Sequence, residues 1–142
     1  MQRIEAIDEY NRAQRLGMRD YREKTAAGKY PYLPALDELL ENTESQIPLG
    51  TIEIPLDYVV GTKTTGRTMA FASNFMPLLP EDTEFASKWL SLCMAHMEEG
   101  IHDAIKAYEY MGRFYVQEGN KRVSVLKYFG ADSIFATVTR VV

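Results

Sequence analysis

The sequence predicts an α+β domain in which helices pack on a mixed sheet, preceded by an N-terminal helical hairpin. Residues 4–27 are rich in strong helix formers. Residues 83–99 place their apolar side chains on one helical face. Residues 105–142 alternate short apolar runs with turn residues, which is typical of strands separated by tight turns. With 142 residues, 46% of them hydrophobic, the chain can bury an ordinary core.

The hairpin is expected within residues 1–47. A helix over residues 4–27 is followed by a break at residues 30–34, which contain two prolines, and by a second helix from Leu36 to about Asn42. The apolar positions are too few for an independent core, so we expect the hairpin to pack on the rest of the chain, on a partner or on a second copy. These positions include Ile4, Ile7, Tyr10, Leu36, Leu39 and Leu40.

A second unit, residues 48–142, is expected after a division near residues 46–50. Its first strand is predicted at residues 54–60, and its central helix at residues 83–99. A further strand is predicted at residues 105–108, before a turn. The apolar face of the central helix carries Phe85, Trp89, Leu92, Cys93 and His96.

The last part of the unit combines a strand, a turn and a short helix. Residues 114–116 are a predicted strand and residues 118–122 a tight turn. The following helix ends at Gly130 and leads to a last strand at residues 134–142. The buried side of this helix is predicted to carry Val123, Val125, Leu126 and Phe129.

The turn at residues 118–122 is a candidate phosphate site. The first amides of a helix have no partner inside it, and the helix dipole adds partial positive charge there. Gly119 lets a ligand approach the backbone, and Lys121 and Arg122 supply full charges. The alternative is a turn glycine with two solvated cations. Cations at a helix start oppose the dipole, which weakens that alternative.

The same residues carry a family resemblance. Residues 118–122, Glu-Gly-Asn-Lys-Arg, resemble the signature of the ParB/sulfiredoxin superfamily, in which an acid or glycine precedes Gly-x-x-Arg. Residues 54–60, Ile-Pro-Leu-Asp-Tyr-Val-Val, resemble the family's first strand, and residues 83–99 its central helix. Residues 100–105 resemble the passage into the next strand, with Ala104 where a proline usually stands. The resemblance covers roughly residues 50–142 and implies a ParB/sulfiredoxin-like fold.

The resemblance also implies ligands and residue roles. In that family the turn binds nucleotide phosphates, which implies a nucleotide of the ATP, ADP or CTP class, with or without Mg²⁺. In free-serine kinases of the same fold the acid of the turn takes part in catalysis, and Glu118 occupies that position. The candidate binding residues are Gly119, Asn120, Lys121, Arg122, Lys63 and Arg67.

Two differences from the family pattern exclude particular functions of that family. Sulfiredoxin-like enzymes need a cysteine inside the turn, and this chain has Asn120 there, so repair of sulfinic acids is not expected. Partition proteins continue into a helix-turn-helix unit, which this chain does not contain. We therefore expect any DNA binding to be weak and non-specific, because only phosphate contacts remain.

The loop at residues 61–68 has the glycine spacing of a P-loop, but Arg67 stands where the P-loop lysine belongs. A planar guanidinium does not replace a compact ammonium in that cavity. We interpret the loop as a polar cover over the same ligand cleft, with Lys63 and Arg67 as phosphate or nucleic-acid contacts. A solvent-exposed hairpin loop is the alternative.

Composition limits the function classes. The net charge of −4 argues against a broad surface for nucleic acid. One cysteine and two histidines provide no disulfide framework and match no zinc pattern, so no metal site is predicted from them. The chain has no run long enough to span a membrane and no apolar signal core, so no membrane partner and a cytoplasmic location are expected.

Three functions remain open from the sequence. The favoured one is a ParB-like domain that binds nucleotide phosphates, with phosphoryl transfer or hydrolysis left undecided. The second is a module related to partition proteins or nucleases that contacts the DNA backbone. The third is a non-catalytic interaction domain that uses its N-terminal helices to dimerise or to bind a partner.

Overall fold

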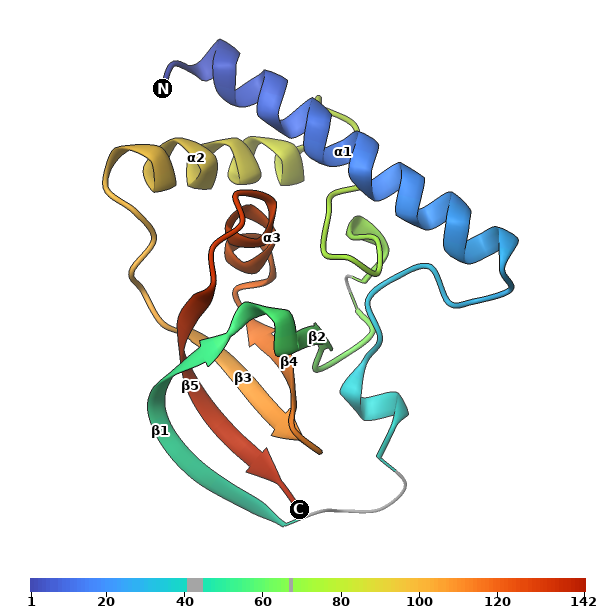
Figure 1. Ribbon diagram of the computed structural model, residues 1–142, viewed down its shortest axis with the longest axis vertical. Coiled ribbons are helices and arrows are strands. Elements are labelled where there is room, and N and C mark those ends of the chain that lie inside the picture. Colours follow the sequence, from blue (N-terminus) through green and yellow to red (C-terminus); the bar gives the residue numbers. More distant parts are fainter. Residues whose placement is uncertain (41–44, 67) are drawn as a thin grey trace.

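The computed structural model describes residues 1–40, 45–66 and 68–142. Within these residues the chain forms three α-helices and one mixed five-stranded sheet (Figure 1), which confirms the α+β class. The helices are α1 (Arg3–Ala26), α2 (Glu84–Glu98) and α3 (Asn120–Tyr128). The strands are β1 (Gln46–Pro55), β2 (Val59–Thr62), β3 (Ile105–Tyr110), β4 (Arg113–Glu118) and β5 (Ser133–Val141).

The sheet is curled. Its order is β1-β5-β3-β4-β2, with antiparallel pairs β1/β5 and β3/β4 and parallel pairs β5/β3 and β4/β2. β1 and β2 lie at opposite edges, yet only the 3-10 turn Leu56–Tyr58 joins them. From Pro55 to Val59 the chain reaches at most about 14 Å. A flat sheet of this size is about 19 Å wide, so the edges must bend toward each other.

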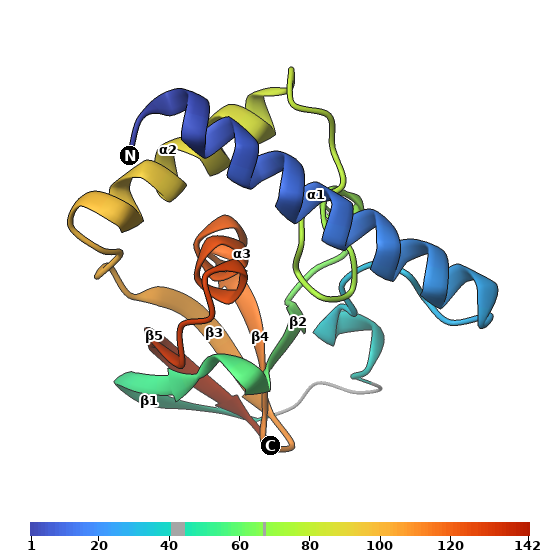
Figure 2. The ribbon, with the colours of Figure 1, turned by 45° about the horizontal axis from the view of Figure 1, so that its top comes forward.

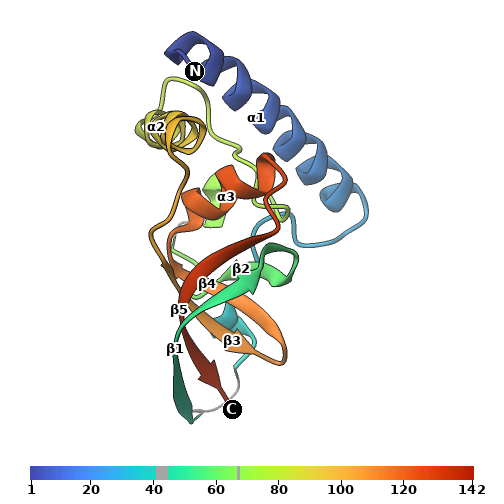
Figure 3. The ribbon, with the colours of Figure 1, turned by 60° about the vertical axis from the view of Figure 1, so that its left-hand side comes forward.

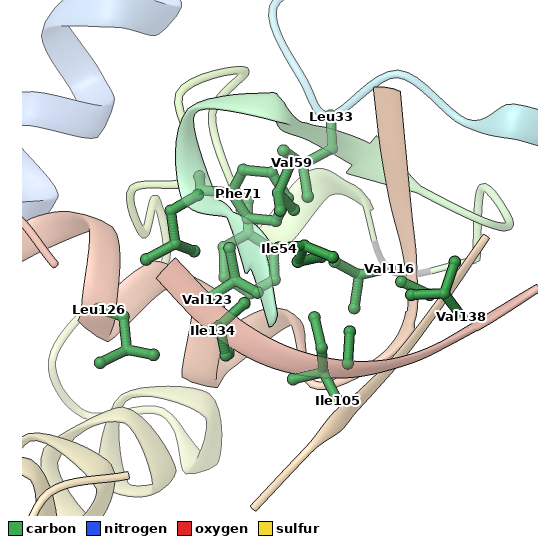
Figure 4. Packing of buried hydrophobic residues seen from close by; sticks show 14 residues of the cluster. Leu33, Ile54, Val59, Phe71, Ile105, Val116, Val123, Leu126, Ile134 and Val138 are labelled. Atoms are coloured by element: carbon green, nitrogen blue, oxygen red, sulfur yellow. The ribbon is translucent and has the colours of Figure 1, made fainter. Parts of the chain in front are cut away.

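The main core fills the inside of this curl (Figure 4). Along β5, Ile134, Ala136 and Val138 are buried while Phe135 and Thr137 are exposed, which is the alternation of a strand with one face on the core. Side chains from the other strands and from α3 meet this buried face. They include Ile54, Val59, Ile105, Val116, Val123 and Leu126.

A second cluster holds the helices together. Tyr10 of α1 meets Trp89 of α2 edge to face at 5.3 Å between ring centres, and Trp89 meets Tyr128 of α3 at 5.8 Å. The Trp89 indole N–H donates to Oγ of Ser124, and both residues are fully buried. Figures 2 and 3 show α3 between the sheet and the pair formed by α1 and α2. The expectation that the N-terminal helix packs on the following unit is confirmed.

The predicted hairpin is wrong in its second half. Instead of a helix from Leu36 to about Asn42, the chain forms a three-residue 3-10 turn at Leu36–Glu38, and Asn42 lies outside the described residues. Tertiary contacts override the helical propensity here. The Thr62 amide donates to the Pro34 carbonyl at 2.9 Å, and Leu36 packs with Tyr115 on the sheet. The segment after α1 is therefore an extended connection to the sheet.

The first strand also differs from the prediction. Residues 46–50, expected to divide the chain, open β1, so the expected boundary between residues 47 and 48 falls inside a strand. Residues 54–60, expected as one strand, contain the end of β1, a 3-10 turn and the start of β2. The Leu56 amide donates to the Asp132 carbonyl at 2.9 Å, which directs the chain out of β1.

The remaining elements agree with their predictions to within a few residues. α1 covers the expected first helix, and α2 begins after Thr83, whose hydroxyl accepts the Ala86 amide at 3.1 Å. β3, β4, α3 and β5 follow in the expected order. The predicted turn at residues 118–122 is thus the junction between β4 and α3.

Candidate functional site

Gly119 forms the junction between β4 and α3. It has a left-handed backbone, with φ of 117°, and its carbonyl accepts the Val123 amide at 3.0 Å, the first hydrogen bond of the helix. A Cβ at this position would lie only 2.4 Å from Cγ2 of Ile105. Backbone conformation and packing therefore both require glycine here. With no side-chain cap at Gly119, the first amides of α3 present their dipoles outward.

A wide pocket of about 1330 Å³ lies at this helix start. Residues 117–122 form one wall, and α2 forms another. Tyr30 and Tyr32 approach from the segment after α1, and Thr65 and Gly66 from the predicted polar loop. From α2 the pocket is lined by Glu84, Phe85, Ser87, Lys88, Ser91 and Leu92.

Two cations lie on the wall formed by α3. Nζ of Lys121 is 5.4 Å from the ring centre of Phe85, within range of a cation–π contact across the pocket. Arg122 donates from one terminal nitrogen to the carbonyls of Asp103 at 3.1 Å and Ala104 at 3.2 Å. Its other terminal nitrogen lies beside Gly119. Arg122 therefore ties α3 to the entry of β3 and also brings positive charge to the helix start.

Asn120 has a structural partner. Its amide nitrogen donates to the Thr62 hydroxyl at 3.2 Å, and that hydroxyl donates to the Val116 carbonyl at 3.0 Å. The chain of bonds ties the start of α3 to β2 and β4. The side-chain oxygen Oδ1 is buried and has no hydrogen-bond partner among the described residues. The side chain that was expected to contact phosphate is thus oriented by the sheet.

Glu118, the expected catalytic acid, lines the pocket but is 64% exposed and pairs with Lys106 at 3.5 Å. The second carboxylate along the pocket, Glu84, pairs with Lys88 at 3.2 Å. Among the described residues no group of three or more histidine, cysteine or acidic side chains could hold a metal ion. A magnesium ion here would depend on Glu118 or Glu84 and on oxygens of the ligand.

The polar loop reaches the pocket through different residues than expected. Thr65 and Gly66 line it, so the expected cleft shared by this loop and the Gly119 turn is present. Lys63 is not among the pocket residues, because its ammonium pairs with Asp37 and lies 5.2 Å from the ring centre of Tyr108. Arg67 lies outside the described residues.

Sequence reasoning missed the tyrosine side of the pocket. Tyr30 and Tyr32 come from the break at residues 30–34, which was predicted only as a helix boundary. An exposed tyrosine next to prolines in a loop is a weak indication of a binding surface. Ser87 and Ser91 on the exposed face of α2 were missed as well. In the sequence, a polar helix face that lines a pocket cannot be distinguished from one that faces solvent.

No helix among the described residues is both long and apolar enough to cross a membrane. No family model, curated protein or solved structure matches the sequence or the fold. The pocket and its lining residues are therefore the features that indicate a function.

Proposed function

We propose that this protein binds a nucleotide through its phosphates at the start of α3, as a domain of the ParB/sulfiredoxin type. The observation that supports the proposal is the meeting of three features in one pocket: a helix start without a side-chain cap, the glycine before it, and two cations in its first turn. A structural role explains Gly119 and part of Arg122. Lys121 adds a second positive charge beside a helix start that is already electropositive, and an anion bound there would be attracted by both.

Electrostatics favours an anion at this place. The N-terminus of a helix carries about half a positive charge, and Lys121 and Arg122 add two full charges within one turn. Charge-assisted hydrogen bonds to phosphate are about twice as strong as neutral ones. A bound phosphate would relieve the repulsion between these charges, so binding should stabilise the fold.

Binding is the function that the geometry supports best, and catalysis would be an addition to it. Phosphoryl transfer or hydrolysis needs a carboxylate beside the attacking oxygen, together with a metal ion on the phosphates. Glu118 is the candidate, and it would have to leave Lys106 to act. A Glu118→Gln variant that retains nucleotide binding but loses any turnover would assign that role.

The test is a thermal-shift series with ATP, ADP, CTP and inorganic phosphate, with and without Mg²⁺. A ligand at a hundred times its dissociation constant stabilises the folded state by about 2.7 kcal/mol, which raises Tm by several degrees in a domain of this size. We expect Lys121→Ala to reduce the shift and Arg122→Ala to remove most of it. Arg122→Ala also loses two carbonyl contacts, so the measured quantity is the shift on ligand addition rather than Tm itself.

Arg15→Ala is the matched control, because Arg15 is an exposed cation on the outer face of α1 and does not line the pocket. Its ligand-induced shift should equal that of the wild type. Equal shifts in all four proteins would remove the site assignment. Stabilisation by duplex DNA but by none of the nucleotides would favour the nucleic-acid alternative.

A further inference from the structure

The pocket is larger than a phosphate group needs. Its volume of about 1330 Å³ exceeds the usual range of roughly 300–1,000 Å³ for small-molecule sites. The phosphates of a ligand seated at the start of α3 would fill one end only. The chemistry of the remaining walls then decides what the rest of the ligand is.

The wall contributed by the segment after α1 is aromatic and exposed. Tyr30 is 58% exposed and lies 5.7 Å from Tyr32 between ring centres, at an edge-to-face angle of 72°. Tyr32 in turn packs against Tyr21 of α1 at 5.6 Å. Met69, which is 65% exposed, lines the same pocket. Tyr30 is thus an exposed ring held by Tyr32, which is itself held by Tyr21, and it can offer a face to a planar group.

Tyr30 also borders a second pocket of about 320 Å³, which shares Tyr30 and Thr65 with the first. This smaller pocket is lined mainly by apolar groups, including Pro34, Ala35 and Leu39. A group stacked on Tyr30 therefore has room to extend into this second pocket. The α2 wall combines serine hydroxyls and the paired Lys88 with Phe85, whose ring is already in contact with Lys121.

We propose that the ligand's nucleobase stacks on Tyr30, with Met69 as a flexible contact, while its phosphates lie at α3. This inference rests on the proposed function and names the part of the ligand that the phosphate site leaves open. Aromatic rings offer a planar face to any base, and thioethers make favourable contacts with aromatic rings. Recognition at Tyr30 therefore depends on a planar ring more than on the identity of the base.

The test compares tripolyphosphate with ATP and CTP by isothermal titration on the full chain. Stacking on one aromatic side chain changes affinity by roughly tenfold. We expect Tyr30→Ala to weaken ATP and CTP by about that factor and to leave tripolyphosphate unchanged, while Tyr30→Phe retains wild-type affinity. Tyr58→Ala is the matched control, since Tyr58 is a 47% exposed tyrosine that does not line either pocket.

The outcomes separate the inference from the proposed function. If neither tripolyphosphate nor nucleotide binds, the proposed function is wrong and the inference falls with it. If tripolyphosphate binds as tightly as ATP, or if Tyr30→Ala leaves nucleotide affinity unchanged, the phosphate site stands and the base site is wrong. Equal weakening of all three ligands by Tyr30→Ala would mean that Tyr30 only shapes the pocket.

Discussion

Asp20 joins α1 to the loop before α2 through a small polar network. The Ser73 hydroxyl donates to one carboxylate oxygen of Asp20 at 2.5 Å, and the Lys24 ammonium donates to the other at 2.8 Å. Burial alone would raise the pKa of Asp20. The hydrogen bonds from Lys24 and Ser73, the charge of Lys24 and the Asn74 amide together hold that pKa below its usual value.

This network predicts a pH-dependent contribution to stability. A carboxyl whose pKa is lower in the folded state stabilises the fold above its unfolded pKa of about 3.9. That contribution is lost as the pH falls through the folded-state pKa. Asp20→Asn should therefore cost about 1.5–3 kcal/mol near pH 7, by loss of charged hydrogen bonds. The cost should shrink well below pH 4. Urea unfolding of the wild type and of Asp20→Asn at several pH values measures this difference in the free energy of unfolding.

Glu23→Gln provides the comparison. Glu23 lies on the same helix and pairs with Arg19 at 3.3 Å, but both side chains are mostly exposed. Exposed pairs contribute about 0–1 kcal/mol, so this variant should be nearly neutral at every pH. A pH-independent cost for Asp20→Asn would show that the carboxylate charge does not matter to the network.

At the level of elements, a buried side-chain hydrogen bond joins α2 to α3 within the helical cluster. Trp89 and Ser124 are both fully buried, and the bond between them measures 3.0 Å. Ser124→Ala would leave the indole N–H without a partner at a fully buried position, which costs about 1–3 kcal/mol. Chemical denaturation should show this loss with no change in the slope of unfolding free energy against denaturant.

A double-mutant cycle isolates the bond. In a Trp89→Phe background no indole N–H remains to be satisfied, so Ser124→Ala should cost much less there than in the wild type. Because α3 carries the proposed phosphate site, loss of the bond should also weaken ligand binding slightly. Equal costs in both backgrounds would mean that Ser124 acts through packing alone.

The elements that were predicted well are those whose ends or buried faces are set by residues close together in the sequence. Thr83 caps α2, an apolar stripe defines its buried face, and Gly119 sets the backbone at the start of α3. β1 has no comparable local signal. Most of its residues are exposed on both faces, and it contains Pro48, Gly50 and Pro55, which are unfavourable in strands. It is a strand because β5 pairs with it. Pairing between residues about 80–95 positions apart cannot be predicted from the residues of β1 alone.

The candidate site was predictable to the same extent. The glycine turn and its two cations are contiguous in the sequence, so the charge at the start of α3 follows from local pattern. The carbonyl contacts of Arg122, the bond from Asn120 to Thr62 and the tyrosine wall all join residues far apart in the chain. Contacts of this kind depend on the tertiary fold and could not be predicted from spacing.

At the scale of the whole molecule, α1 should unfold with the sheet. Tyr10 is fully buried in the helical cluster, and the same cluster includes Val125 of α3, whose neighbours Val123 and Leu126 belong to the main core. One cooperative transition is therefore expected. Tyr10→Ala and Ile134→Ala should each cost roughly 2–5 kcal/mol and shift that single transition.

Two probes follow this transition. Fluorescence reports on Trp89, the one tryptophan of the chain, and far-ultraviolet circular dichroism reports on all elements. The two curves should coincide for the wild type and both variants. An earlier, separate transition in Tyr10→Ala would show that α1 is an independent unit.

The pairing of β1 with β5 also has a consequence during synthesis of the chain. β5 lies between β1 and β3, so β1 has no strand partner until residues 133–141 have been made. At roughly 5–20 residues per second the ribosome takes several seconds to add residues 56–132, which separate β1 from β5. During this time the ten residues of β1 are an unpaired, mostly uncharged strand, which is the kind of segment that chaperones bind and that aggregates when they do not. Expression yield should therefore be sensitive to changes in β5, because β1 stays unpaired when β5 fails to form.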